Sequence, residues 1–303
     1  IKISAAATVT LNGGTYIGDT DNGSFVKAVH NDDVVDASGC TINMNDVTMT
    51  SNRRFFDTNT LDTDASTPTL QVTGGTYTTD GQAFGVDIVN LSPVTFTNVT
   101  VTAGTGPCIE VCGPAATFTD CTFTVTGTNS NGFGTTAVAT SCEGTAVIDG
   151  GTYSAPNGYG VYVYNSGGTI NIESGTVSGG TAAVKADSDV RDPQNGSKVT
   201  ITGGNINGPI QIESGDSSNA SLTVTGGYFT SDPSDYVAED YAAVESDVDG
   251  YTYMVAPATT GAVETEVAPA APSVTLPSGL EGEDATAAES VKTELEKNTA
   301  LVT

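Results

Sequence analysis

The 303-residue sequence contains no tryptophan, one histidine and few cations: nine lysines and arginines stand against 36 aspartates and glutamates, a net charge of −27. Without a basic cluster, a nucleic-acid-binding surface is excluded, and an anionic membrane surface would repel the chain. No apolar run approaches the ~18 residues of a membrane span. The five cysteines show no CxxC spacing, which argues against a zinc site.

The chain is instead rich in Thr, Ser, Gly and Asn, residues that favour strands and turns. Nine six-residue segments align with one another, as in Leu11–Tyr16, Val72–Tyr77 and Ile148–Tyr153. They begin at positions 11, 44, 72, 96, 118, 148, 172, 201 and 224. Their first and sixth residues are always apolar, and their third is Gly, Asp, Asn or Ser.

This repeat predicts an all-β, right-handed parallel β-helix of about nine coils. Alternation along a strand points both apolar columns inward, and the third residue suits a bend with left-handed backbone angles. The spacing, which varies upward from 22 residues, fits coils with loops inserted at their corners. An antiparallel sandwich is the alternative, but it would not repeat the same residue classes at the same offsets.

The composition divides the chain into three parts. We expect the β-helix over residues 1–230, its C-terminal cap over 231–255, and a Pro/Ala/Glu-rich linker with a short helix over 256–303. Because the sequence starts at Ile1 without a signal-like segment, we also expect it to be part of a longer chain.

The closing segment carries a family resemblance. The stretch from Gly226 to Val237, followed by Gly250–Val255, resembles the end of repetitive pectin-lyase-like β-helix proteins that Gram-positive gut bacteria secrete or display. In that family a final Gly-Gly-aromatic coil is followed by Ser-Asp-Pro, a short helix and a closing strand. The resemblance implies an extracellular location, secreted or attached to the cell wall, more than it implies a chemistry.

A second strand after each bend provides a column of polar residues. Its members in successive coils are Lys27, Asp87, Glu110, Tyr162, Lys185 and Gln211. Because stacked strands lie ~4.8 Å apart, we expect Asp87 and Glu110 to be neighbours. Paired carboxylates can perform acid–base chemistry or bind a sugar, with Tyr162 as a stacking platform and Lys185 beside it. An ordinary solvated face is the alternative.

Calcium is the one cofactor that the sequence suggests. Asp19 and Asp21, and likewise Asp187 and Asp189, place carboxylates two residues apart in loops, and oxygen ligands of this kind suit Ca²⁺. Asp-rich turns without any metal are the alternative. Since the stacked coils bury a continuous core, we expect the ion to be optional for folding.

The cysteines occupy defined places in the repeat. Cys112 and Cys142 each lie six residues before a repeat segment, so we expect them to face each other, either bonded or stacked. Cys121 takes the fourth position of its segment, which Val47 and Val99 fill elsewhere. That position points inward in those coils, so we expect a buried free thiol.

Threonines flank the inward sixth column on both sides, as in Thr76 and Thr78. Both flanking residues point outward, which predicts two rows of hydroxyl groups on one flat sheet. Ice-binding β-helices display such rows. Threonine is also simply a good residue for a solvent-facing strand.

Taken together, these features favour binding over catalysis. Pectin-degrading hydrolases of this fold use clustered aspartates with a histidine and an Arg-x-Lys pair. In this chain the single histidine is His30, the only adjacent pair of basic residues is Arg53–Arg54, and no Arg-x-Lys sequence occurs. We therefore expect an extracellular, non-catalytic adhesion or glycan-binding module whose partner is a glycan or another host or bacterial surface ligand. The alternatives are a carbohydrate-active enzyme (polysaccharide lyase or glycoside hydrolase) and a structural stalk or ice-binding face.

Overall fold

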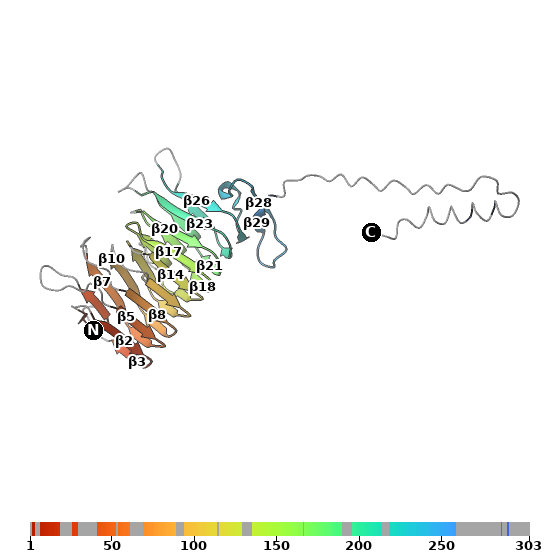
Figure 1. Ribbon diagram of the computed structural model, residues 1–303. Coiled ribbons are helices and arrows are strands. Elements are labelled where there is room, and N and C mark those ends of the chain that lie inside the picture. Colours follow the sequence, from red (N-terminus) through yellow and green to blue (C-terminus); the bar gives the residue numbers. More distant parts are fainter. Residues whose placement is uncertain are drawn as a thin grey trace. The chain divides into compact units, whose positions relative to one another are not determined.

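A computed structural model of the chain contains three β-sheets that wind together into a parallel β-solenoid, which confirms the predicted fold class (Figure 1). The structure describes residues 2–3, 7–18, 26–29, 41–52, 54–60, 69–88, 94–113, 115–128, 135–165, 167–189, 196–213, 218–258, 286 and 290. Residues 1–258 form one compact unit and 259–303 a second. Of the second unit only Thr286 and Ser290 are described, and both are helical. Ala256 and Pro257, which the sequence assigned to the linker, belong to the last strand, Tyr253–Pro257. The rest of the expected linker and helix, from residue 259 onward, lies outside the described residues.

Each turn of the solenoid contributes strands to sheets B, C and A in that order. Sheet A contains β1 (Lys2–Ile3), β4 (Val26–Val29), β7 (Phe56–Thr60), β10 (Phe84–Ile88), β13 (Ile109–Cys112), β16 (Thr136–Ser141), β19 (Tyr159–Val163), β22 (Ala182–Ala186) and β25 (Ile210–Ile212). Sheet B contains β2 (Thr8–Asn12), β5 (Thr41–Asn45), β8 (Thr69–Thr73), β11 (Val94–Thr97), β14 (Ala115–Thr119), β17 (Thr145–Asp149), β20 (Gly168–Ile172), β23 (Ser197–Ile201) and β26 (Ser221–Val224). Sheet C contains β3 (Thr15–Gly18), β6 (Thr48–Ser51), β9 (Thr76–Thr79), β12 (Thr100–Ala103), β15 (Thr122–Val125), β18 (Thr152–Ala155), β21 (Thr176–Gly179), β24 (Asn205–Asn207), β27 (Gly227–Phe229), β29 (Tyr253–Pro257) and β28 (Tyr241–Glu245).

The register of sheets B and C is the one that the repeat predicts. Phe96 lies opposite Val72 on one side and Phe118 on the other, and the first column continues in this way from Leu11 to Val224. The sixth column aligns through Tyr16, Met49, Tyr77, Val101, Phe123, Tyr153, Val177, Ile206 and Phe229. Both columns are buried from the second coil onward, so like residues stack on one another to form the core.

The bends between sheets B and C have the predicted left-handed backbone at six of the nine third-column positions. These six are Gly13, Asp46, Gly74, Asn98, Asp120 and Gly150. The last three segments lack this left-handed backbone at their third residues, which are Ser174, Gly203 and Gly226. Because only Gly, Asn and Asp enter this region at low cost, the composition of the column follows from the backbone.

The last described part of the first unit departs from the parallel stack. After Phe229 a short 3₁₀ helix (Ser234–Tyr236) follows a turn in which Asp232 Oδ1 accepts hydrogen bonds from the Ser234 backbone N–H (2.9 Å) and hydroxyl (2.5 Å). Strand β29 then pairs antiparallel with β27, and β28 pairs antiparallel with β29. None of the described helical residues belongs to a segment long and apolar enough to cross a membrane.

Candidate functional site

The predicted polar column lies on sheet A, but one of its members is misplaced. Glu110 lies opposite Gly85, whereas Asp87, two residues further along β10, lies opposite Asn59. The prediction that Asp87 and Glu110 form a carboxylate pair is therefore wrong. A slip of two residues leaves the inward and outward faces unchanged, so the hydrophobic pattern could not detect it.

Glu110 forms a small polar site of its own. Gln82 Nε2 donates to Glu110 Oε2 at 3.1 Å, and the Ser141 hydroxyl donates to Glu110 Oε1 at 3.2 Å. In the column, Ala139 separates Glu110 from Tyr162. The carboxylate of Glu110 is thus held by neutral donors and does not join the cluster around Tyr162.

Tyr162 and Lys185 lie opposite each other on β19 and β22, and Asp187 joins them. The hydroxyl of Tyr162 donates to Asp187 Oδ2, and the Lys185 ammonium lies 2.9 Å from Asp187 Oδ1. The same ammonium lies 5.4 Å from the ring centroid of Tyr162 and 5.6 Å from that of Tyr159, within range of a cation–π interaction. Burial, together with the hydrogen bond to Asp187, raises the pKa of the Tyr162 phenol far above its usual range.

Two further tyrosines, which the sequence did not indicate, complete an aromatic group that we call the tyrosine cluster: Tyr159, Tyr162 and Tyr164. Ring centroids are 5.0 Å apart between Tyr159 and Tyr162 and 5.7 Å apart between Tyr162 and Tyr164. Strict alternation would place Tyr159 and Tyr162 on opposite faces of the sheet, because they are three residues apart. The strand is irregular at Gly160, where a Cβ atom would lie 2.6 Å from Val177 Cγ1 in the core. A glycine inside a strand is the sequence signal for such an irregularity.

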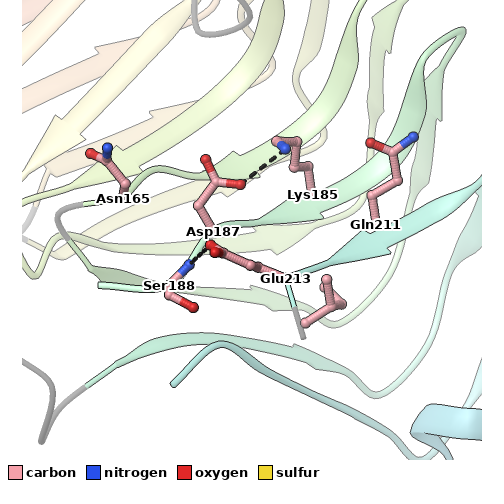
Figure 2. Close-up of a pocket in the computed structure, with 7 residues that line it drawn as sticks. Asn165, Lys185, Asp187, Ser188, Gln211 and Glu213 are labelled. Carbon is pink, nitrogen blue, oxygen red and sulfur yellow. Dashed lines mark hydrogen bonds and ion pairs between the residues drawn. The ribbon is translucent and has the colours of Figure 1, made fainter. Parts of the chain in front are cut away.

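Beside the tyrosine cluster, an open polar pocket of about 510 Å³ lies on the same sheet (Figure 2). We call it the sheet A pocket; it is lined by Asn165, Lys185, Asp187, Ser188, Gln211, Ile212 and Glu213. These side chains, drawn in Figure 2, come from three successive coils: from the segment after β19, from β22 and the residues that follow it, and from β25 and the residue that follows it. The pocket therefore depends on the stacking of these coils.

Two lining residues of the sheet A pocket, Ser188 and Glu213, take part in hydrogen bonds between coils. The Ser188 backbone N–H donates to Glu213 Oε2 at 2.6 Å, and the Ser188 hydroxyl donates to that of Ser218 at 2.8 Å. The side-chain amide of Asn219 pairs with the backbone of Asp189, accepting at 2.6 Å and donating at 3.0 Å. These contacts fix the backbone that follows β22 against the next coil.

The structure describes only one of the two loops in which the sequence predicted a calcium site. Asp19 and Asp21 lie outside the described residues. Asp187 is bound to Tyr162 and Lys185, and Asp189 is 4% exposed, with its Oδ2 2.2 Å from the place that a Cβ on Gly167 would take. Within the described part of the chain, no three His, Cys, Asp or Glu residues are grouped so as to hold a metal ion.

The cysteine predictions are met in part. Cys121 is a free thiol with no exposed surface, as predicted, and burial raises its pKa to about 11. Cys112 lies opposite Ser141, which is the residue before Cys142. The two cysteines are therefore in neighbouring coils, one residue out of the predicted register. Both Cys112 and Cys142 are half-buried, and their pairing stays a prediction.

The threonine rows lie on the outer face of sheet C, as predicted. One row contains Thr48, Thr76, Thr100, Thr122, Thr152, Thr176 and Asn205, and the other contains Thr50, Thr78, Thr102, Thr124, Ser154, Ser178 and Asn207. All of these residues are exposed or half-buried, and strands β6 to β24 of this sheet carry no charged residue. This face, which we call the threonine face, is uncharged in an otherwise acidic protein.

The fold and the site define a parallel β-solenoid with a polar pocket on one sheet, two of whose lining residues, Lys185 and Asp187, contact the tyrosine cluster. No protein-family model, curated protein or solved structure matches the chain. The geometry of the pocket and of the threonine face is therefore the basis for a functional assignment.

Proposed function

We propose that this chain is an extracellular, non-catalytic binding module that holds a glycan in the sheet A pocket. The observation that carries the proposal is the position of the tyrosine cluster next to a pocket lined by amides and carboxylates from three coils. Its open form suits one part of an extended polymer better than an enclosed small molecule.

The chemistry of the lining residues matches sugar hydroxyl groups. Asn165 and Gln211 offer amides that both donate and accept, and Glu213 offers carboxylate oxygens that only accept. The half-buried rings of Tyr159 and Tyr164 provide apolar faces for the C–H groups of a pyranose. A flat ligand with alternating polar edges and apolar faces satisfies both kinds of surface.

Binding is a better explanation of these residues than catalysis. Asp187 has one oxygen bonded to Tyr162 and the other paired with Lys185, an arrangement that fixes the carboxylate in place. The pair that would have favoured a glycosidase, Asp87 with Glu110, is not formed. We therefore assign Asp187 a positioning role.

The extracellular location is part of the same proposal. It is supported by the acidic, Thr- and Gly-rich composition and by the resemblance of the closing segment to displayed β-helix proteins. A surface-displayed module also gives a glycan site access to its ligand.

A glycan array probed with the purified chain tests the proposal, followed by titration calorimetry on any glycan that binds. Gln211→Ala should weaken binding about fivefold to tenfold, because it removes hydrogen bonds to the ligand. Gln71→Ala is the matched control, since Gln71 is also an exposed glutamine on a strand but lies on sheet B. Absence of binding to every glycan, or equal losses in both variants, would rule out this site.

The threonine face supports a second candidate, binding to ice, because its rows are regular and uncharged. Stacked strands repeat every ~4.8 Å, so the hydroxyls form a periodic array. Ice recrystallisation assays of the wild type and Thr102→Lys test it. Inhibition by the wild type and its loss in the variant would support this function, and no inhibition would exclude it.

A further inference from the structure

We infer that the sheet A pocket selects uncharged oligosaccharides and rejects those that carry carboxylate or sulfate groups. The inference rests on the proposed glycan-binding function and adds the class of ligand. It follows from how the charges in the pocket are already paired.

Lys185 is the only cation among the residues that line the pocket, and its charge is already compensated. Its ammonium lies 2.9 Å from Asp187 Oδ1 and near the faces of two tyrosine rings. Asp187 is held in turn by the Tyr162 hydroxyl. An anionic ligand would have to compete with a fixed carboxylate for this ammonium, which costs more than it gains.

The remaining charge in the pocket is negative. Lys185 and Asp187 cancel, so Glu213, which is exposed, leaves the lining with a net charge of −1. The chain as a whole carries −27. A ligand carboxylate within a few ångströms of Glu213 would be repelled by an amount that corresponds to about tenfold in affinity at moderate salt.

The hydrogen-bonding groups of the pocket point to the same class of ligand. Gln211 Nε2 donates to the Thr181 carbonyl oxygen at 3.2 Å, which engages one of the two N–H groups of this amide. Glu213 is an acceptor only. At Glu213 and at the amide oxygens of Asn165 and Gln211 a ligand must donate, and sugar hydroxyls donate whereas carboxylates and sulfates do not.

The experiment measures binding of matched oligosaccharides, equal in length and linkage, built either from hexose or from the corresponding hexuronate. Wild type should bind the hexose form at least about tenfold more tightly than the hexuronate form. Glu213→Gln should reduce this difference in affinity. Asp187→Asn should reduce it further, because the Lys185 ammonium would then have no paired carboxylate and could bind the hexuronate. Glu245→Gln is the control, because it makes the same charge change on β28, outside the pocket lining.

The outcomes separate the two proposals. Hexuronate binding as tight as hexose binding would overturn the inference and leave glycan binding intact. The inference would also be overturned if Glu213→Gln and Glu245→Gln reduced the affinity difference between hexose and hexuronate equally, or if neither variant reduced it. In both cases the pocket would not be the source of the selectivity. Binding of neither form, together with an array on which no glycan binds, would overturn the proposed function and the inference with it.

Discussion

The carbonyl oxygen of Cys121 lies 2.0 Å from the position that a Cβ atom on Gly151 would occupy in the next coil. The same oxygen accepts a hydrogen bond from the Thr152 N–H at 2.7 Å. Val47 and Gly75 repeat this relationship, with a separation of 2.3 Å. At these two bends a residue with a side chain is thus followed in the next coil by a position that only glycine can fill, because the two backbones approach so closely.

Gly151→Ala should therefore destabilise the solenoid strongly. Gly151 has a φ of +79°, and the added methyl group would meet backbone atoms of Cys121 that cannot move without moving the coil. We expect a loss of roughly 3 kcal/mol or more, measured by chemical denaturation. Gly13→Ala is the control: its φ is +62° but nothing lies within 4 Å, so only about 1 kcal/mol should be lost. Equal losses would show that contact between coils does not set the requirement for glycine.

Val72→Asp should be far more damaging than Thr76→Asp. Val72 is 1% exposed in the inward column of sheet B, so an aspartate there would bury an unpaired charge at roughly 4 kcal/mol or more. Thr76 is exposed on the outer face of sheet C, where aspartate should cost less than about 1 kcal/mol. Thermal melts of both variants compare the two positions. Similar melting temperatures would contradict the division into inner and outer faces.

Removal of divalent ions should leave the melting temperature unchanged. The described core is a continuous stack of apolar side chains, and such a stack needs no ion to close it. Melts recorded in calcium and in EDTA measure the effect, with Asp19→Asn and Asp21→Asn variants to locate any change. A large drop in EDTA that these variants reproduce would make the Asp19 and Asp21 loop a structural calcium site.

The buried thiols should react only when the chain opens. Burial raises the pKa of Cys121 to about 11 and that of Cys108 well above its usual range, so neither forms much thiolate at pH 8. An Ellman titration should leave both unmodified in the native state and modify both in denaturant. Because an unfolded thiol ionises near a pKa of about 8.5, these groups should lower stability as the pH rises from about 8.5 towards 11. Mass spectrometry of a non-reduced digest identifies which cysteines react and whether Cys112 is bonded to Cys142.

The sequence was sufficient for the fold because the repeat encodes it redundantly. Three features of the sequence place Phe96 between Val72 and Phe118: it is apolar, it is the first residue of its six-residue segment, and it lies two residues before the left-handed bend at Asn98. Sheets B and C are joined by bends of nearly constant length, so errors do not accumulate between them. The inward columns could therefore be assigned residue by residue, and the left-handed bends at six of the nine positions.

The site was only half predictable because it depends on irregular features. Tyr162 and Lys185 were placed in one column correctly, since β19 and β22 keep the regular register. The slip at Asp87 comes from corner segments whose length varies, and alternation does not report a shift of two residues. The contact between Tyr159 and Tyr162 depends on the irregular backbone at Gly160. The extent of such an irregularity cannot be determined from the sequence. Asp187, expected to bind calcium, pairs instead with the lysine two residues before it.

The backbone hydrogen bonds of all three sheets join one coil to the next, and so they run along the solenoid axis. A pulling force along this axis would load each junction directly and in series, and coils would separate one after another rather than by shearing a whole sheet. The sheet A pocket draws its side chains from the coils of β19, β22 and β25. Under sufficient tension the junctions between these strands would open and the pocket would lose its shape, so that the proposed glycan binding would depend on the mechanical strength of those junctions.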